Sequence, residues 1–134
     1  MQTLGFVEAF AKFGAKLENP MWAVSSIADD GSFVMSCWSH YFKSGEEGIL
    51  LYVDSLSRWK GNALGNRLLS AHLKKATTEG LLVRLVVATA VDTKAVDSGQ
   101  DGSKIKKTFH VRQDVVGKIR DFDGDAYAIE FKRL

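Results

Sequence analysis

The sequence predicts an α+β protein with two helices and a strongly curved antiparallel or mixed sheet of small, barrel-like form. Three observations support this class. Two stretches repeat apolar residues at helical spacing, six or seven short runs have strand character, and tight turns join several of these runs into hairpins. The chain has 134 residues, of which 46% are hydrophobic and 25% charged, which favours one soluble globular domain over residues 1–134.

The first expected element is a helix that ends before Pro20, because the residue preceding a proline is pushed out of the helical conformation. Its apolar residues recur at steps of four and three and form one stripe that faces the core. These residues are Phe6, Phe10, Phe13 and Leu17.

Three strands follow, at 22–28, 32–42 and 49–54, and the first two flank the hairpin turn Asp29-Asp30-Gly31. Alternation along 32–42 divides its side chains between two faces of the sheet. One face carries Val34, Trp38, His40 and Phe42, and the other carries Phe33, Met35, Cys37 and Tyr41.

The second half begins with a helix at about 62–77 and a strand at 81–89, whose nearly continuous apolar run indicates burial on both faces. Residues 92–106 are expected to form a polar loop, and a loop of this length in a compact domain is more often functional or mobile than idle. The last elements are strands at 107–112, 115–122 and 125–132, the final two joined by the turn Asp123-Gly124.

Several classes of protein are disfavoured by composition. The single cysteine, Cys37, cannot form an intramolecular disulfide, and the N-terminus lacks the basic and apolar regions of a secretion signal. No window approaches the ~20 apolar residues that a membrane span requires. We therefore expect a cytoplasmic protein without membrane partners, and the oligomeric state stays open.

Charge is distributed unevenly along the chain, although the formal net charge is only +2. Residues 1–55 carry three basic and seven acidic side chains, a balance of −4, whereas residues 56–134 carry fifteen basic and nine acidic ones, a balance of +6. Clustered cations favour a polyanionic partner, because binding releases the counterions condensed on it. A pair of solvated faces explains the same pattern.

Residues that carry catalysis in other proteins form no strong motif here. Cys37 and His40 are spaced so that they face opposite sides of one strand, and the segment 121–125 has its glycine too early for a calcium loop. The histidines lack the paired spacing of metal sites. We expect no metal and no cofactor, and favour a binding module over an enzyme. The three histidines are His40, His72 and His110.

A metal-dependent nuclease remains as an alternative. Glu130 and Lys132, preceded by acidic residues, follow the outline of a site in which two carboxylates hold a divalent metal and a lysine positions water. An exposed Glu/Lys pair on an edge strand explains these residues equally. The acidic residues are Asp121, Asp123 and Asp125.

The most distinctive segment, residues 57–67, is basic, contains a tryptophan and begins a helix. Backbone N–H groups at the start of a helix favour phosphate, a tryptophan stacks on bases, and an asparagine caps a helix or reads a base edge. A capped helix with its tryptophan in the core is the structural alternative. The candidate nucleic-acid contacts here are Arg58, Trp59, Lys60, Asn62, Asn66 and Arg67.

A second basic segment interleaves cations with an aromatic residue at the end of the expected loop. This pattern suits a clamp on a nucleic-acid backbone, although lysines also protect a strand edge from aggregation. Its candidate contacts are Lys104, Lys106, Lys107, His110 and Arg112. Trp38 and His40 are candidates for contact with a base or a protein partner.

Residues 59–88 resemble part of the SRA-like and related PUA-like domains. The resemblance rests on Trp59-Lys60-Gly61-Asn62, then Gly65-Asn66-Arg67-Leu68-Leu69 with His72, and the strand Val83-Arg84-Leu85-Val86-Val87. It covers about 30 residues and implies a curved β-barrel of a kind that reads modified bases in DNA or binds RNA. An aromatic pair that would enclose a flipped base is not evident, although Trp38, Tyr41 and Trp59 are available.

Our leading hypothesis is a nucleic-acid-binding module without catalysis, whose partner is DNA or RNA. It would bind phosphates through segments 58–67 and 104–112 and contact a base. A protein–protein adaptor or inhibitor is the main alternative. It would act through acidic residues in the loops of the N-terminal half, which are Asp29, Asp30, Glu46 and Glu47.

Overall fold

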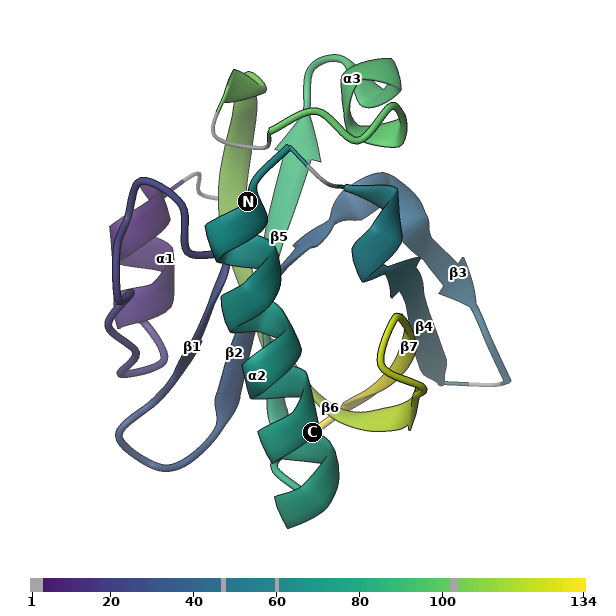
Figure 1. Cartoon of the computed structure of the whole chain (residues 1–134). Coiled ribbons are helices and arrows are strands. Elements are labelled where there is room, and N and C mark those ends of the chain that lie inside the picture. Colours follow the sequence, from purple (N-terminus) through teal and green to yellow (C-terminus); the bar gives the residue numbers. More distant parts are fainter. Residues whose placement is uncertain (1–3, 47, 60, 102–103) are drawn as a thin grey trace.

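The computed structural model describes residues 4–46, 48–59, 61–101 and 104–134. One seven-stranded mixed sheet runs through it in the order β1-β2-β5-β6-β7-β4-β3 (Figure 1). β2 and β5 are parallel, and the other neighbouring pairs are antiparallel. The strands are β1 (Ser25–Ile27), β2 (Phe33–Trp38), β3 (Phe42–Ser44), β4 (Ile49–Ser55), β5 (Val83–Ala90), β6 (Lys107–Phe122) and β7 (Ala126–Arg133).

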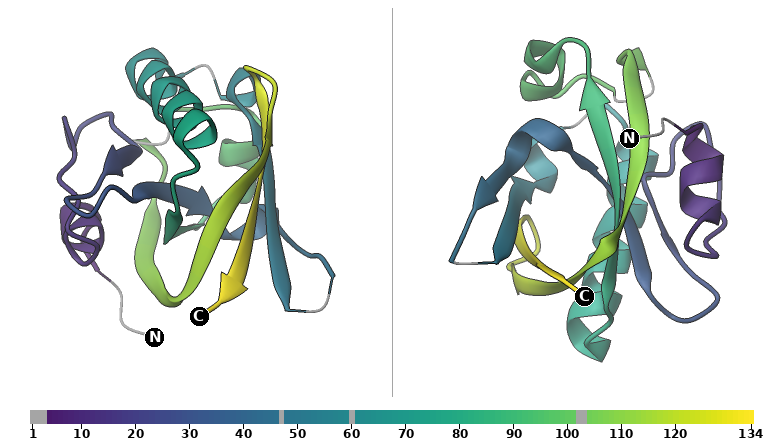
Figure 2. Two further views of the ribbon diagram at one scale, coloured as in Figure 1. Left: turned by 90° about the horizontal axis from the view of Figure 1, so that it is seen from below. Right: turned by 180° about the vertical axis from the view of Figure 1, so that it is seen from behind.

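Three α-helices accompany the sheet within the described residues, and the α+β class is confirmed. Helix α2 (Ala63–Glu79) lies across the sheet, whereas α1 (Phe6–Ala11) and α3 (Thr93–Asp97) are short (Figure 1). Two 3₁₀ turns, η1 (Ser39–Tyr41) and η2 (Leu56–Arg58), follow β2 and β4. The sheet is bent (Figure 2), but β1 and β3 are its edges and the strand pairing does not close it.

Two hydrophobic clusters hold these elements together. The larger one joins the buried side of α2 to the sheet through Leu69, Leu73 and Ala76. The smaller one packs Phe10 of α1 against Val86 of β5 and neighbouring residues. Side chains of β2 alternate between the two faces of the sheet and so contribute to both clusters. Phe33, Met35 and Cys37 belong to the first cluster, and Val34 and Trp38 pack in the second.

The N-terminal helix is shorter than its apolar repeat predicts. It ends at Ala11, and Gly14 follows with φ +72°, a left-handed conformation that suits glycine and ends helices. Phe13 and Leu17 still pack on the second cluster, but from the turn and the loop that follow. The hydrophobic pattern therefore identified residues that pack on the second cluster, Phe10 and Leu17 buried and Phe6 and Phe13 partly buried, whereas the extension of the helix to Pro20 is wrong.

Three further boundaries differ from the expectation. The strand expected at 32–42 ends at Trp38, so His40 lies in η1 rather than on a strand face. The two strands expected at 107–112 and 115–122 form the single strand β6, which shifts register against both of its neighbours. The expected loop contains α3, because the Asp92 side chain caps its first turn by accepting from the Lys94 N–H (3.0 Å).

The remaining long elements agree with the sequence in type. Helix α2, strand β5 and the β6–β7 hairpin with its turn at Asp123-Gly124 lie within a few residues of their expected positions. No helix in the described part of the chain is long and apolar enough to cross a membrane.

Candidate functional site

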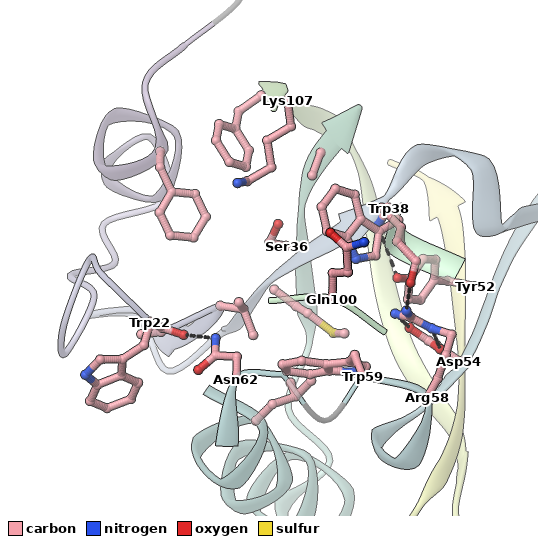
Figure 3. Close-up of a pocket in the computed structure, with 18 of the residues that line it drawn as sticks. Trp22, Ser36, Trp38, Tyr52, Asp54, Arg58, Trp59, Asn62, Gln100 and Lys107 are labelled. Atoms are coloured by element: carbon pink, nitrogen blue, oxygen red, sulfur yellow. Dashed lines mark hydrogen bonds and ion pairs between the residues drawn. The ribbon is translucent and has the colours of Figure 1, made fainter. Parts of the chain in front are cut away.

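A pocket of about 340 Å³ opens where the two hydrophobic clusters meet (Figure 3). Both clusters contribute to its lining. The first cluster supplies Met35 and Leu69, and the second supplies Ala88 and Phe109. Its lining is mostly apolar and unusually rich in aromatic rings, and we call it the aromatic pocket. The aromatic residues are Phe6, Trp22, Trp38, Tyr52, Trp59, Phe109 and Tyr127.

One side of the aromatic pocket is held by a buried ion pair. Arg58 Nε and Nη2 donate to the two carboxylate oxygens of Asp54 at 2.6 and 2.7 Å, a bidentate geometry. The Asp54 side chain is only 4% exposed and that of Arg58 18%. The guanidinium also lies 4.8 Å from the centre of the Tyr41 ring. These contacts occupy the guanidinium inside the protein, so Arg58 positions the pocket rather than facing solvent.

The same arginine attaches residues 92–101, the α3 segment, to the pocket. Arg58 Nη1 donates to the carbonyl oxygen of Val96 at 2.7 Å. Gly99, at φ +80°, packs so closely on Arg58 that a Cβ there would collide with the arginine's carbonyl oxygen. Val96 and Gln100 consequently line the pocket, and α3 itself sits at the top of the molecule in Figure 1.

A second set of hydrogen bonds anchors α3 to η1. The Tyr41 hydroxyl donates to Asp97 Oδ1 at 2.6 Å, and His40 Nε2 lies 3.1 Å from the same oxygen. The hydrogen bond from Tyr41, followed by that from His40, lowers the pKa of the exposed Asp97 carboxyl. Burial, together with the bond to Asp97, raises the pKa of Tyr41, so its hydroxyl stays a donor at neutral pH. His40 itself is not among the pocket-lining residues.

The opposite side of the pocket is fixed by asparagines at the start of α2. Asn62 Oδ1 accepts from the Gly65 N–H at 3.0 Å and caps the helix, while its Nδ2 donates to the Trp22 carbonyl oxygen at 2.7 Å. Asn66 Nδ2 donates to the carbonyl oxygens of Leu56 and Trp59 at 2.7 and 2.9 Å. Both side chains therefore organise the backbone that presents Trp22 and Trp59.

Trp38 and Trp59 come from different parts of the chain and line one pocket. Trp38 ends β2, and its backbone N–H donates to the Tyr52 hydroxyl at 3.1 Å. Trp59 follows η2 and packs on the first cluster. In Figure 3 the labelled Trp22 lies at the opposite end of the pocket from Trp38 and Tyr52. The arrangement offers flat apolar surfaces to a planar ligand.

Two polar side chains of the lining, Ser36 and Gln100, have hydrogen-bonding capacity left for a ligand, and Lys107 also lines the pocket. Ser36 and Gln100 make no side-chain hydrogen bond with another described residue, and Ser36 lies within the pocket in Figure 3. Lys107 Nζ donates to the Ile105 carbonyl oxygen at 3.0 Å. Burial lowers the pKa of Lys107, against an opposing effect of Asp101.

The other predicted contacts fall into two groups. Arg67, Lys104 and Lys106 are exposed and form no ion pair with the described residues. His110 and Arg112 lie further along β6 and do not line the aromatic pocket. Arg112 forms a bidentate pair with Asp114 at 2.8 and 3.0 Å, and burial followed by Arg112 lowers the pKa of His110.

One predicted residue, Lys60, lies outside the described residues, so no contact is assigned to it. The sequence interpretation overlooked Phe6, Trp22, Asp54 and Gln100 as residues of a site. Only Asp54 left a signal, since it ends an apolar strand four residues before an arginine. Trp22 and Gln100 reach the pocket through turns whose course depends on tertiary contacts.

The residues considered for thiol catalysis, metal binding and the nuclease alternative do not come together in one site within the described part of the chain. Cys37 is fully buried and its pKa is raised well above the ordinary value by burial, which disfavours the thiolate. Glu130 lies 3.5 Å from Arg120 across the β6–β7 hairpin, and Asp123 Oδ1 accepts backbone N–H bonds that form the hairpin turn. Within the described ranges no three His, Cys, Asp or Glu side chains gather as ligands for a metal.

Comparisons with known proteins do not extend this description. No protein-family model, curated protein or solved structure matches the chain.

Proposed function

We propose that this protein is a non-catalytic nucleic-acid-binding module that receives one unstacked base in the aromatic pocket. The observation that carries the proposal is the pocket itself, with Trp38 and Trp59 in its lining and a volume of about 340 Å³. That volume falls within the range of small-ligand sites, which are concave and mostly apolar with a few polar groups. Tryptophan faces stack on any nucleobase, which gives about 1–3 kcal/mol per base.

Polar recognition of the base is assigned to Ser36 and Gln100. Both line the pocket and make no side-chain hydrogen bond with another described residue, whereas Asp54, Arg58 and Asn62 are occupied by contacts within the protein. A glutamine amide presents a donor and an acceptor side by side, which matches the paired donor and acceptor at the edge of a base. The pocket thus combines stacking surfaces with a small polar edge.

Phosphate contacts are assigned to the exposed cations near the pocket. Lys104 and Lys106 precede the pocket residue Lys107, and Arg67 lies on α2 shortly after the cap residue Asn62. Arg58, Asn62 and Asn66 move from the phosphate role expected from the sequence to a positioning role. The finer resemblance to a PUA-like barrel is kept as part of this proposal, supported by the bent sheet and by α2 lying across it.

The adaptor alternative receives less support from the positions of its acidic residues. Asp29 and Asp30 lie in the β1–β2 turn and Glu46 lies in the β3–β4 turn. These two hairpins form opposite edges of the sheet and lie far apart in the ribbon views (Figures 1 and 2). Glu47 is outside the described residues. These two turns do not form one surface, so a single acidic interface is not built.

Fluorescence anisotropy with labelled single-stranded and duplex DNA and RNA at 50–300 mM salt tests the proposal. Trp38→Ala should weaken binding by about 1–3 kcal/mol, roughly 5- to 150-fold, with the salt slope unchanged. Trp38→Phe, which keeps a ring, should retain most of the affinity. The double variant Lys104→Ala/Lys106→Ala should instead reduce the slope of log K against log salt by about 0.9 per lost duplex phosphate contact.

Lys118→Ala, an exposed lysine further along β6, is the matched control for the lysine variants. Circular dichroism should show that each variant keeps its fold. Absence of binding to every nucleic acid at 50 mM salt would reject the proposed function, and equal binding by wild type and Trp38→Ala would reject the pocket as the base site.

A further inference from the structure

A second cavity, of about 390 Å³, lies between the β3–β4 turn, the middle of β6 and the end of β7. It shares no lining residue with the aromatic pocket. Its lining combines apolar side chains with two arginines and, among the described residues, one acidic side chain. The apolar residues are Ile49, Leu50, Val115 and Phe131, the arginines are Arg112 and Arg133, and the acidic residue is Glu46.

The two arginines occupy positions at which the strand pattern predicts core side chains. Alternate residues of β7 are buried as far as Phe131, and Arg133 is the next residue on that face. Its neighbour across the ladder, Val115, is only 3% exposed. Arg112 of β6 lies directly opposite the core residue Leu85, and side chains that are opposite each other share one face. Both arginines therefore reach the second cavity from the core-facing side of the sheet.

The guanidinium group of Arg112 is held in a fixed orientation by Asp114. Nε and Nη2 donate to the two carboxylate oxygens at 2.8 and 3.0 Å, which engages two of the five N–H donors. The hydrogen bond from Arg112 lowers the pKa of Asp114, and the charge of Arg133 adds to this effect, so the carboxylate stays ionised at neutral pH. Arg133 itself is exposed and forms no ion pair with a described residue. The two arginines together can therefore donate to a further anion.

We propose that the second cavity binds a monocarboxylate with an apolar tail, such as a medium-chain fatty acid. The carboxylate pairs with Arg112 and Arg133, and the tail lies against Val115 and Phe131. Guanidinium groups bind carboxylates through paired hydrogen bonds, and the volume of the cavity lies within the range of small-ligand sites. A phosphate uses the arginines and leaves the apolar side chains uncovered, so the lining favours a carboxylate that carries a tail. The inference goes beyond the proposed function, because it concerns a separate cavity.

Isothermal titration calorimetry of the full chain with octanoate, below the concentration at which octanoate forms micelles, tests this proposal. The variants are Arg133→Met and, as the matched control, Lys132→Met. Lys132 is the preceding residue of β7, faces the other side of the sheet and does not line the second cavity. Both side chains are exposed, so both variants should keep the fold, which circular dichroism checks.

Arg133→Met should weaken octanoate binding about tenfold, because it removes hydrogen bonds to a charged group, whereas Lys132→Met should change the affinity less than twofold. Glu46→Gln should strengthen binding, because it removes a negative charge from the lining. Affinity should rise from butanoate to hexanoate to octanoate by up to about fourfold per added methylene, since burying one CH₂ contributes about 0.8 kcal/mol. Octanol, which lacks the carboxylate, should bind at least tenfold more weakly than octanoate.

Three results would overturn the carboxylate site: no saturable binding of octanoate by the wild type, no dependence on chain length, or equal losses in Arg133→Met and Lys132→Met. Labelled single-stranded DNA, at an ionic strength matched with sodium chloride, separates a carboxylate from a phosphate. Saturating octanoate should leave the affinity for this DNA unchanged. Competition that disappears in Arg133→Met would assign the cavity to a nucleic-acid phosphate and overturn the proposal. The proposed function is tested separately by the Trp38 variants, so either claim can fail alone.

Discussion

Asp54 and Arg58 form a bidentate ion pair within one short stretch of chain, with Nε–Oδ1 and Nη2–Oδ2 distances of 2.6 and 2.7 Å. Asp54 belongs to β4 and Arg58 to η2, and the third hydrogen bond of the guanidinium reaches the carbonyl oxygen of Val96 in α3. One side chain thus connects the end of a strand, a 3₁₀ turn and the α3 segment around the aromatic pocket.

Arg58→Met should destabilise the protein strongly, because it leaves the Asp54 carboxylate buried without its partner. Breaking a buried ion pair in this way costs about 3–5 kcal/mol, and the partial exposure of Arg58 places the expected loss near the lower end, about 3 kcal/mol. Urea denaturation measures the change in the free energy of unfolding.

Arg120→Met is the matched control for Arg58→Met. Arg120 is 57% exposed and lies 3.5 Å from Glu130, and exposed pairs contribute about 0–1 kcal/mol. If the two variants lose similar amounts of unfolding free energy, the Asp54–Arg58 pair contributes no more to stability than an exposed ion pair does.

Gly99→Ala should disturb the α3 segment and the pocket that it lines. The added Cβ would collide with the carbonyl oxygen of Arg58, and residue 99 has φ +80°, which L side chains rarely adopt. Gly31→Ala is the control, since Gly31 has φ +88° but no atom within 4 Å of an added Cβ. Comparing the two by thermal denaturation separates the collision from the backbone strain, and Gly99→Ala should lower Tm by more.

Stability should fall as the pH decreases below about 6.5, and His72 should contribute to that fall. His72 Nδ1 lies 2.7 Å from the Ser25 hydroxyl, and burial, opposed by Glu18, lowers the pKa of His72 below its ordinary value of 6.5. Between the folded and unfolded pKa values the unfolded chain binds more protons, so the stabilisation is complete above pH 6.5 and is lost as the pH drops toward the folded pKa.

Urea denaturation of wild type, His72→Gln and His110→Gln from pH 8 to 5 measures the His72 contribution. The pKa of His110 is also lowered by burial, so its variant accounts for the second histidine. His72→Gln should flatten the decline in unfolding free energy between pH 6.5 and 5. A decline as steep as in wild type would contradict the assignment to His72.

The sequence predicted features that depend on short-range patterns. The apolar spacing of Leu69 and Leu73 identified α2, and Asp123-Gly124 identified the β6–β7 turn. The turn at Gly14 was missed, because the stripe of phenylalanines continues through it although the helix does not. The third helix was missed for a similar reason: five residues with one capping aspartate give no periodicity.

The pocket depended on contacts that a sequence does not display. Trp38, Trp59 and Lys107 were singled out as separate candidates, and the fold brings them to one pocket. Their joint position follows from the pairing of β2, β5 and β6 and from the asparagine bonds that place Trp59, none of which is local. Arg58 was wrongly predicted to face solvent and contact nucleic acid, because Asp54 was interpreted as the polar end of a strand rather than as the partner of Arg58.

The central claim, that a base enters the aromatic pocket, is tested most directly by nuclear magnetic resonance of the tryptophan indole N–H groups. The chain has three tryptophans, Trp22, Trp38 and Trp59, and each lines the pocket, so ¹⁵N-labelled protein gives three indole signals to follow while nucleoside monophosphates are added. The signals of Trp38 and Trp59 should move in a saturable way, and Trp38→Ala should weaken that saturation. Movement confined to the backbone signals of Lys104 and Lys106, with the indole signals unchanged, would contradict the claim and leave only binding of phosphate at the surface.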